Sequence, residues 1–126
     1  MKKIIIFVLT TLLFSQPVHA TESKTECDLM KRAFIEAMLD KIGNAVRING
    51  TNRLWYRGVE EILDVSRPDP RKLTHFNVTI RVQTFAGPHN PPYALETMTF
   101  KLPEGEVINY NIKWLKPFVN HWKFHT

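Results

Sequence analysis

The sequence contains a single cysteine, so no disulfide bond can form within the chain, although disulfides commonly stabilise small extracellular domains. It also lacks a long hydrophobic run: the run near its start, Ile4–Phe14, covers eleven residues, whereas a membrane-spanning helix needs about twenty. Serine nucleophile motifs, phosphate-binding glycine loops and paired metal motifs are missing as well. Packing alone must therefore stabilise the fold, and none of these common catalytic motifs identifies an activity.

The N-terminus has the three parts of a secretory signal peptide. Lys2 and Lys3 precede the apolar run, and Val18-His19-Ala20 places small residues at the recognised cleavage positions. We therefore predict cleavage near Ala20 and a mature chain that is secreted, either extracellular or associated with the cell envelope. No transmembrane segment is expected in the mature chain.

Removal of residues 1–20 leaves 106 of the 126 residues, which is enough for one domain. It also lowers the count of Lys and Arg from 17 to 15, against 12 Asp and Glu, and the resulting excess of +3 is too small to indicate a nucleic-acid partner. We interpret residues 21–25 as a flexible leader, 26–114 as a single domain and 115–126 as an aromatic and basic tail.

A helical period follows the leader. Thr25 and Asp28 resemble a capping box, and apolar residues then recur at steps of three or four as far as Arg47. The stripe consists of Cys27, Met30, Phe34, Ile35, Met38, Leu39, Ile42 and Val46. Such a stripe is typical of a core, so we assign it no cofactor. Cys27 is either part of that core or a thiol free to react or to bridge two chains.

From Trp55 onward the apolar period changes to two, which is typical of half-buried strands. The inward residues of the predicted strands are, in chain order, Trp55, Val59, Leu63 and Val65; Phe76, Val78, Ile80, Val82 and Thr84; Met98 and Phe100; and Ile108, Tyr110, Ile112 and Trp114. Short turns at 67–71 and 103–105 predict an antiparallel meander. We therefore predict the α+β class, with one N-terminal amphipathic helix packed on a four-stranded antiparallel sheet, a layout shared with cystatin-like folds and half of the cone-shaped NTF2-like fold.

The segment between the second and third predicted strands is the most distinctive. Gly87 tolerates a positive φ, and three prolines stiffen the chain around it. A stiff loop loses little entropy when a partner binds it. We predict that the partner-binding residues are Gly87, Pro88, His89, Asn90, Pro91, Pro92 and Tyr93. The same residues would also suit a wide hairpin with no partner, in which Tyr93 packs and Asn90 bonds its own backbone.

Other polar groups give weaker indications. The histidines at 75, 89, 121 and 125 have no carboxylate or second thiol near them in sequence, so we expect neither a metal site nor a cofactor. Glu60, Glu61 and Asp64 are interpreted as a solvated strand surface, because adjacent strand residues point to opposite faces. The aromatic and basic residues of the tail suit a lipid headgroup boundary, a protein partner or the closure of the core.

The run Phe76–Phe100, with its Gly-Pro-His-Asn-Pro-Pro-Tyr core, resembles a family of small secreted proteins from spore-forming Gram-positive bacteria that is catalogued as a domain of unknown function. The resemblance covers roughly Asp28 to Tyr110. It implies secretion and a single domain, and it implies no activity. The tail after Trp114 is additional to the family pattern.

A second resemblance concerns Gln83-Thr84-Phe85-Ala86-Gly87, which is similar to the Gln-x-Val-x-Gly hairpin of cystatin-type protease inhibitors, with Phe85 in place of the valine. Three functions therefore stay open. The first is a non-catalytic interaction module that binds a protein or a cell-envelope component through the 87–93 loop. The others are a cystatin-like protease inhibitor and a small NTF2-like enzyme or ligand-binding protein. Homodimer formation is open as well.

Overall fold

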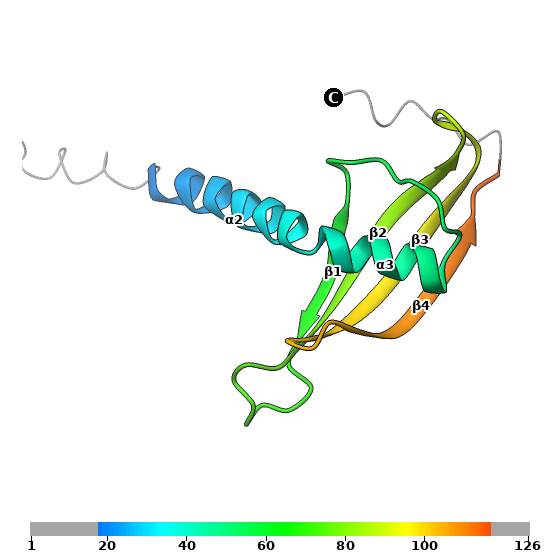
Figure 1. Cartoon of the computed structure of the whole chain (residues 1–126). Coiled ribbons are helices and arrows are strands. Elements are labelled where there is room, and N and C mark those ends of the chain that lie inside the picture. Colours follow the sequence, from blue (N-terminus) through cyan, green and yellow to red (C-terminus); the bar gives the residue numbers. More distant parts are fainter. Residues whose placement is uncertain (1–17, 117–126) are drawn as a thin grey trace, which may run out of the picture. The chain divides into compact units, whose positions relative to one another are not determined.

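The computed structural model describes residues 18–116, and Figure 1 shows the course of the chain. Its elements are α2 (Val18–Ala37), α3 (Leu39–Asn49), β1 (Glu61–Ser66), β2 (Phe76–Ala86), β3 (Asn90–Leu102) and β4 (Glu106–Trp114). The chain divides into two compact units, Met1–Phe34 and Ile35–Thr126, of which the second contains α3 and the sheet. Residues 1–17 and 117–126, which hold most of the predicted signal peptide and tail, lie outside the described residues.

The four strands form one antiparallel sheet in the order β1-β2-β3-β4, so each strand pairs with its neighbour in sequence. The predicted α+β layout, with helix before an antiparallel meander, is confirmed. Short turns at 87–89 and 103–105 join the last three strands, and a longer irregular segment joins β1 to β2.

One face of the sheet forms the core. The inward residues of β2 and β3 pair across the strands, with Val78 opposite Phe100 and Ile80 opposite Met98, and all of them are at most 2% exposed. α3 lies across this face (Figure 1), and its Ile42 and Val46 are equally buried. The inward residues predicted for these two strands are buried except for Phe76 at the start of β2, which is partly exposed.

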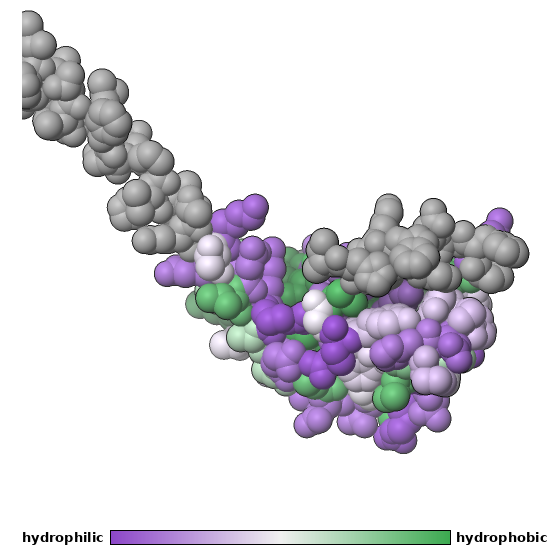
Figure 2. Space-filling model, turned by 90° about the horizontal axis from the view of Figure 1, so that it is seen from above, coloured by the Kyte–Doolittle hydropathy of each residue, from purple (hydrophilic) through white to green (hydrophobic). Residues whose placement is uncertain are grey.

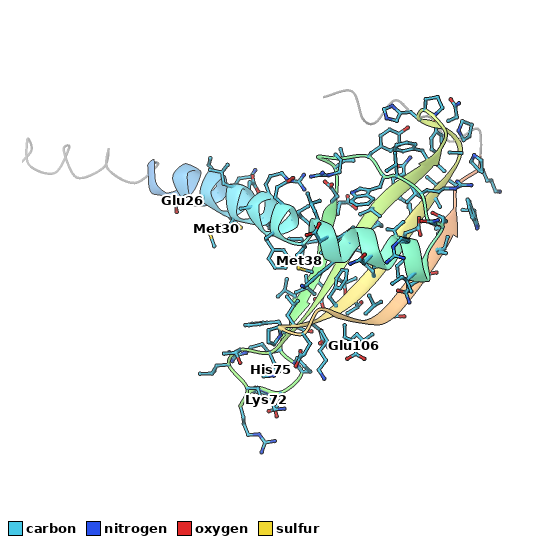
Figure 3. All side chains as sticks on the ribbon, viewed as in Figure 1. Glu26, Met30, Met38, Lys72, His75 and Glu106 are labelled. Carbon is cyan, nitrogen blue, oxygen red and sulfur yellow. The ribbon has the colours of Figure 1, made fainter. Side chains whose placement is uncertain are left out.

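The single predicted helix is instead two helices. It begins at Val18, upstream of the predicted cap at Thr25, and it is interrupted at Met38 (labelled in Figure 3). The amide of Met38 bonds the carbonyl of Ile35, a tighter turn than an α-helix makes, and its own carbonyl then accepts from Ile42. The apolar stripe runs through this break without losing its phase, so its spacing gave no sign of the interruption.

The start of the stripe is not part of the core. Cys27 and Met30 are exposed, and Met30 retains 71% of its surface, whereas Ile35 and Met38 are at most 5% exposed. Cys27 is thus a free thiol at the surface of α2. Of the two interpretations offered for this cysteine, burial in the core is wrong.

The two edge strands depart from their predicted faces because each contains an irregularity. In β1 the register shifts between Ile62 and Asp64, so Ile62 lies opposite Ile80 while Leu63 stays 46% exposed. In β4 the register shifts between Val107, the partner of Phe100, and Asn109, the partner of Thr99. Ile108 between them is 47% exposed. A bulge inserts one residue and reverses the side of everything beyond it, which a strict period of two cannot represent.

No helix among the described residues combines the length and the apolar composition needed to span a membrane. In the view of Figure 2, small hydrophobic areas alternate with hydrophilic ones over the described surface. Their scatter is ordinary for a folded domain, since exposed apolar atoms are common on protein surfaces.

Candidate functional site

The predicted binding loop is a tight hairpin. Ala86 of β2 pairs with Asn90 of β3, so only Gly87, Pro88 and His89 lie outside the strands. The amide of His89 donates to the carbonyl of Gly87 at 3.1 Å, which closes a three-residue turn around Pro88. Both Gly87 (φ 51°) and His89 (φ 65°) have left-handed backbones, a conformation that is uncommon for a histidine and is held in place only by its surroundings.

Three aromatic residues, Tyr56, Phe85 and Tyr93, contact His89. Its ring meets Phe85 edge-on with centroids 4.6 Å apart and lies 5.2 Å from the ring of Tyr56. The hydroxyl of Tyr93 donates to the His89 carbonyl at 2.9 Å, and that of Tyr56 reaches the same oxygen at 3.4 Å. Both the ring and the backbone of His89 are therefore fixed.

Burial raises the pKa of Tyr56, and its hydrogen bond with Tyr93 raises it further. The hydroxyl of Tyr56 consequently stays protonated at neutral pH and is able to donate. The turn is held by neutral hydrogen bonds, which are less sensitive to salt than ion pairs.

The seven predicted binding residues differ in their exposure to solvent. Residues 87–92 are exposed, whereas Tyr93 is 8% exposed and belongs to the core. Tyr93 therefore acts as a support for the turn, and the accessible surface is the tip formed by the other six residues. We call residues 87–92 the hairpin tip.

Two residues that the sequence did not assign to this site flank the hairpin tip. The guanidinium of Arg53 donates to the carbonyl of Pro92 at 2.7 Å and lies 5.0 Å above the ring of Trp114. Trp114 is 53% exposed and Leu54, next to Arg53, is 70% exposed. The prolines and Trp114 could have indicated a surface of proline and aromatic side chains. No neighbouring residue in the sequence indicates a role for Arg53, because its partners lie far away in the sequence.

The domain also buries two carboxylates. Glu60, which the sequence assigned to a solvated surface, has a fully buried side chain that accepts from Trp55 Nε1 at 3.1 Å, from Arg57 Nε at 2.7 Å and from the amide of Gly58 at 2.8 Å. Arg57 also pairs with Glu36 at 2.7 Å. Glu60 thus stabilises the turn that leads into β1. The prediction that Glu60 lies on a solvated strand surface is wrong.

Glu96 lies on the core face of β3 and is completely buried. One of its oxygens accepts from the amide of Thr51 at 2.9 Å and from Tyr110 Oη at 2.7 Å, and the other accepts from Thr51 Oγ1 at 2.6 Å. Both oxygens are therefore engaged within the domain. This carboxylate fastens the segment after α3 to the sheet and leaves no lone oxygen aimed at a ligand.

The Glu96–Tyr110 contact predicts a response to high pH. Burial raises the pKa of Tyr110, and the hydrogen bond to Glu96 raises it further. Since the folded-state pKa lies above the unfolded value of about 10, the stabilisation is complete below that pH and is lost as the pH rises above it. Tyr110→Phe should lower the free energy of unfolding by about 1.5 kcal/mol at neutral pH.

Urea titrations of wild type and Tyr110→Phe, from neutral pH to about 11, measure this response. We expect the difference between the two proteins to shrink above pH of about 10, where only wild type has to bury an ionisable hydroxyl at residue 110. A difference that stays constant over the whole range would contradict the assignment.

The remaining candidate groups do not assemble into a centre. Among residues 18–116, no three of the His, Cys, Asp and Glu side chains gather as metal ligands would. His75 lies on the segment before β2 (Figure 3), where it faces Glu104 at 3.7 Å, and His89 belongs to the hairpin tip. His121 and His125 lie outside the described residues.

The cystatin-like segment is largely enclosed. Gln83, Thr84 and Phe85 are each at most 9% exposed, Ala86 is partly exposed, and Gly87 at the end of the segment is exposed. β2 continues to Ala86, so Gly87 is the one residue of the motif that lies in the turn. The structure therefore does not present these side chains at the tip of a loop.

Comparison with known proteins gives a family assignment. No curated protein and no solved structure matches the chain. One family profile matches residues 30–113, more than half of the 126 residues, and this span contains α3, the hairpin tip and both buried carboxylates. The chain therefore belongs to the family described as "Protein of unknown function (DUF3888)".

Proposed function

We propose that this protein is an exported, non-catalytic binding module that contacts a protein or another component of the cell envelope through the hairpin tip. The observation that carries the proposal is the double clamp on His89, whose carbonyl accepts from two tyrosines while its ring packs on Phe85. Export is supported by Lys2, Lys3 and the apolar run that follows them.

A clamped tip favours binding for an energetic reason. Ordering a flexible loop at an interface costs about 0.5–1.5 kcal/mol for each side chain that becomes immobile. At the hairpin tip part of this cost is met during folding, because residues 87–92 are exposed while His89 among them packs on Phe85 and Tyr56. Strained backbone on a rigid support is also more frequent at functional positions than elsewhere.

Neither alternative function gains support from the geometry. An inhibitor hairpin would need Gln83–Phe85 at the surface, and these residues are buried. An NTF2-like enzyme would need a polar pocket under the helix, where Met38, Ile80 and Phe100 are at most 5% exposed. We therefore propose the binding module alone.

The tip predicts a loss of binding when its side chains are removed. His89→Ala combined with Asn90→Ala deletes two exposed groups and leaves the buried supports intact, so we expect at least about tenfold weaker retention on isolated cell-envelope fractions. A matched control is Lys101→Ala with Glu106→Ala, an exposed pair at the opposite end of the sheet. Retention of the tip variant equal to that of wild type would remove the role of the hairpin.

The clamp itself is tested separately by Tyr56→Phe combined with Tyr93→Phe. This change deletes both hydroxyl groups that reach the His89 carbonyl and alters none of residues 87–92. If rigidity contributes to affinity, retention should fall severalfold while the exposed surface stays the same. An unaltered retention would show that the tip binds by its chemistry and that its rigidity is irrelevant.

A further inference from the structure

The two edges of the sheet differ in how they are protected. An edge strand presents unpaired backbone groups to which another strand can add, and short length, bulges and charges normally prevent this. β1 has six residues, a bulge in its middle and the acids Glu61 and Asp64. β4 is longer, with nine residues that include the charges Glu106 and Lys113, and its irregularity lies near its start.

The outer side of β4 pairs with no other strand within residues 18–116. Six residues, Asn109–Trp114, form a regular stretch in which every residue has a partner on β3. Main-chain groups in such a stretch are the usual basis of strand addition. β4 is therefore the edge that can accept another strand.

The side chains of β4 are sorted by face. Tyr110, Ile112 and Trp114 lie opposite Met98, Glu96 and Ala94, on the face that α3 covers. Asn109, Asn111 and Lys113 project from the other face and are exposed. Ile108, at the irregularity just before this stretch, and Trp114, at its end, are 47% and 53% exposed, so apolar surface remains uncovered along the edge.

We infer that a second copy of this chain pairs antiparallel along β4, with Asn111 on the two-fold axis. In this register Tyr110 lies opposite Ile112 of the second copy, Ile108 opposite Trp114, and Asn109 opposite Lys113. Apolar residues then face apolar residues, polar face polar, and no two like charges meet. The occupant is a second copy because the pattern of β4 complements itself.

Other symmetric registers fit less well. In a two-fold antiparallel pair the axis must pass through one residue, which then lies opposite the same residue of the other copy. An axis between two residues would place core-face side chains opposite outer-face side chains. With the axis at Tyr110, Val107 of one copy would lie opposite Lys113 of the other. Val107 lies on the core face, opposite Phe100 of β3, whereas Lys113 lies on the outer face. An axis at Ile112 would leave only residues 110–114 paired within β4.

This pairing would make one continuous sheet from two copies. The end of β4 and the hairpin tip lie at the same end of the sheet (Figure 1), so antiparallel pairing sends the two tips to opposite ends. A dimer with two binding tips would retain a surface more strongly than one copy through avidity. The dimer does not depend on the proposed function, because it uses β4 and leaves residues 87–92 free.

A charge-exchange experiment tests both the dimer and its register. Asn111→Asp or Asn111→Lys alone places like charges opposite each other across the axis, so each should raise the dimer dissociation constant at least about tenfold in sedimentation velocity runs. An equimolar mixture of the two variants should restore the dimer, because Asp then faces Lys. Ser66→Asp, exposed on the other edge, is the matched control and should associate like wild type.

The outcomes decide the inference in either direction. A wild-type chain that stays monomeric at about 100 μM, or dimers that both Asn111 variants leave unchanged, would overturn it. Stronger association of Asn111→Asp would overturn the register, since it would indicate Lys113 opposite residue 111. As a second measurement, Asn111→Cys in a Cys27→Ser background should form an interchain disulfide on oxidation, whereas Ser66→Cys in that background should not.

Discussion

Replacement of Glu96 by alanine is expected to lower the free energy of unfolding by about 4 kcal/mol, because a buried acceptor of three hydrogen bonds is lost. The side chain has no exposed surface. Its donors, the amide and hydroxyl of Thr51 and the hydroxyl of Tyr110, are partly buried and would lose this acceptor. The empty volume left by the carboxylate adds a cavity cost to the loss of these bonds.

Urea unfolding followed by far-ultraviolet circular dichroism measures this loss. Glu96→Gln keeps the volume and one acceptor oxygen and should cost about half as much, since hydrogen bonds to a neutral group are weaker. Glu106→Gln, an exposed glutamate on β4, should change stability by less than about 0.5 kcal/mol. A loss below about 1 kcal/mol for Glu96→Ala would show that the donors find other partners on relaxation.

The contrast between β2 and β1 shows what the sequence could determine about the fold. In β2 the sequence alternates without interruption from Phe76 to Thr84, and burial in the structure follows that alternation from Val78 to Val82, beyond which Gln83 is buried as well. β1 is an edge strand whose bulge lies after Ile62, and its exposed apolar residues leave no clean alternation. A period is informative only where burial on one face enforces it.

The candidate site was found in part because glycine and proline act locally. The left-handed turn at Gly87 and the stiffness of Pro88 are properties of the residues themselves, so the sequence indicated a rigid loop. The aromatic support could not be predicted, because Tyr56 and Phe85 meet only after segment 54–56 pairs with β2. Contacts between distant segments depend on tertiary structure that spacing does not encode.

Glu96 was missed for a similar reason, although one signal was present. It occupies an inward position of β3, two residues before Met98, where a charged side chain conflicts with the apolar pattern. A carboxylate at such a position requires hydrogen-bond donors in the interior, and one of them, Thr51, lies 45 residues away in sequence. The conflict itself identifies a buried polar cluster, even when its partners are unknown.

The same cluster makes Gly50 intolerant of any side chain, and Gly50→Ala should destabilise the domain by about 4 kcal/mol through overpacking and the disrupted bond between Glu96 and Tyr110. A Cβ at this position would overlap both the Glu96 carboxylate and the Tyr110 hydroxyl, which are held against each other. The backbone of Gly50 is extended (φ −111°), so the cost is steric and owes nothing to a conformation reserved for glycine. Gly58→Ala is the informative contrast, because its φ of 87° strains a side chain although no atom lies near its Cβ.

Urea unfolding of Gly50→Ala, Glu96→Ala and the double variant separates overlap from backbone effects. Since Glu96→Ala removes one of the two groups that a new Cβ would meet, the double variant should be at least about 1 kcal/mol more stable than the sum of the single losses predicts. Additive losses would mean that residue 50 acts independently of Glu96. In that case the connection between α3 and the sheet would have to be maintained by contacts other than the buried carboxylate, and the large loss expected for Glu96→Ala would need a different cause.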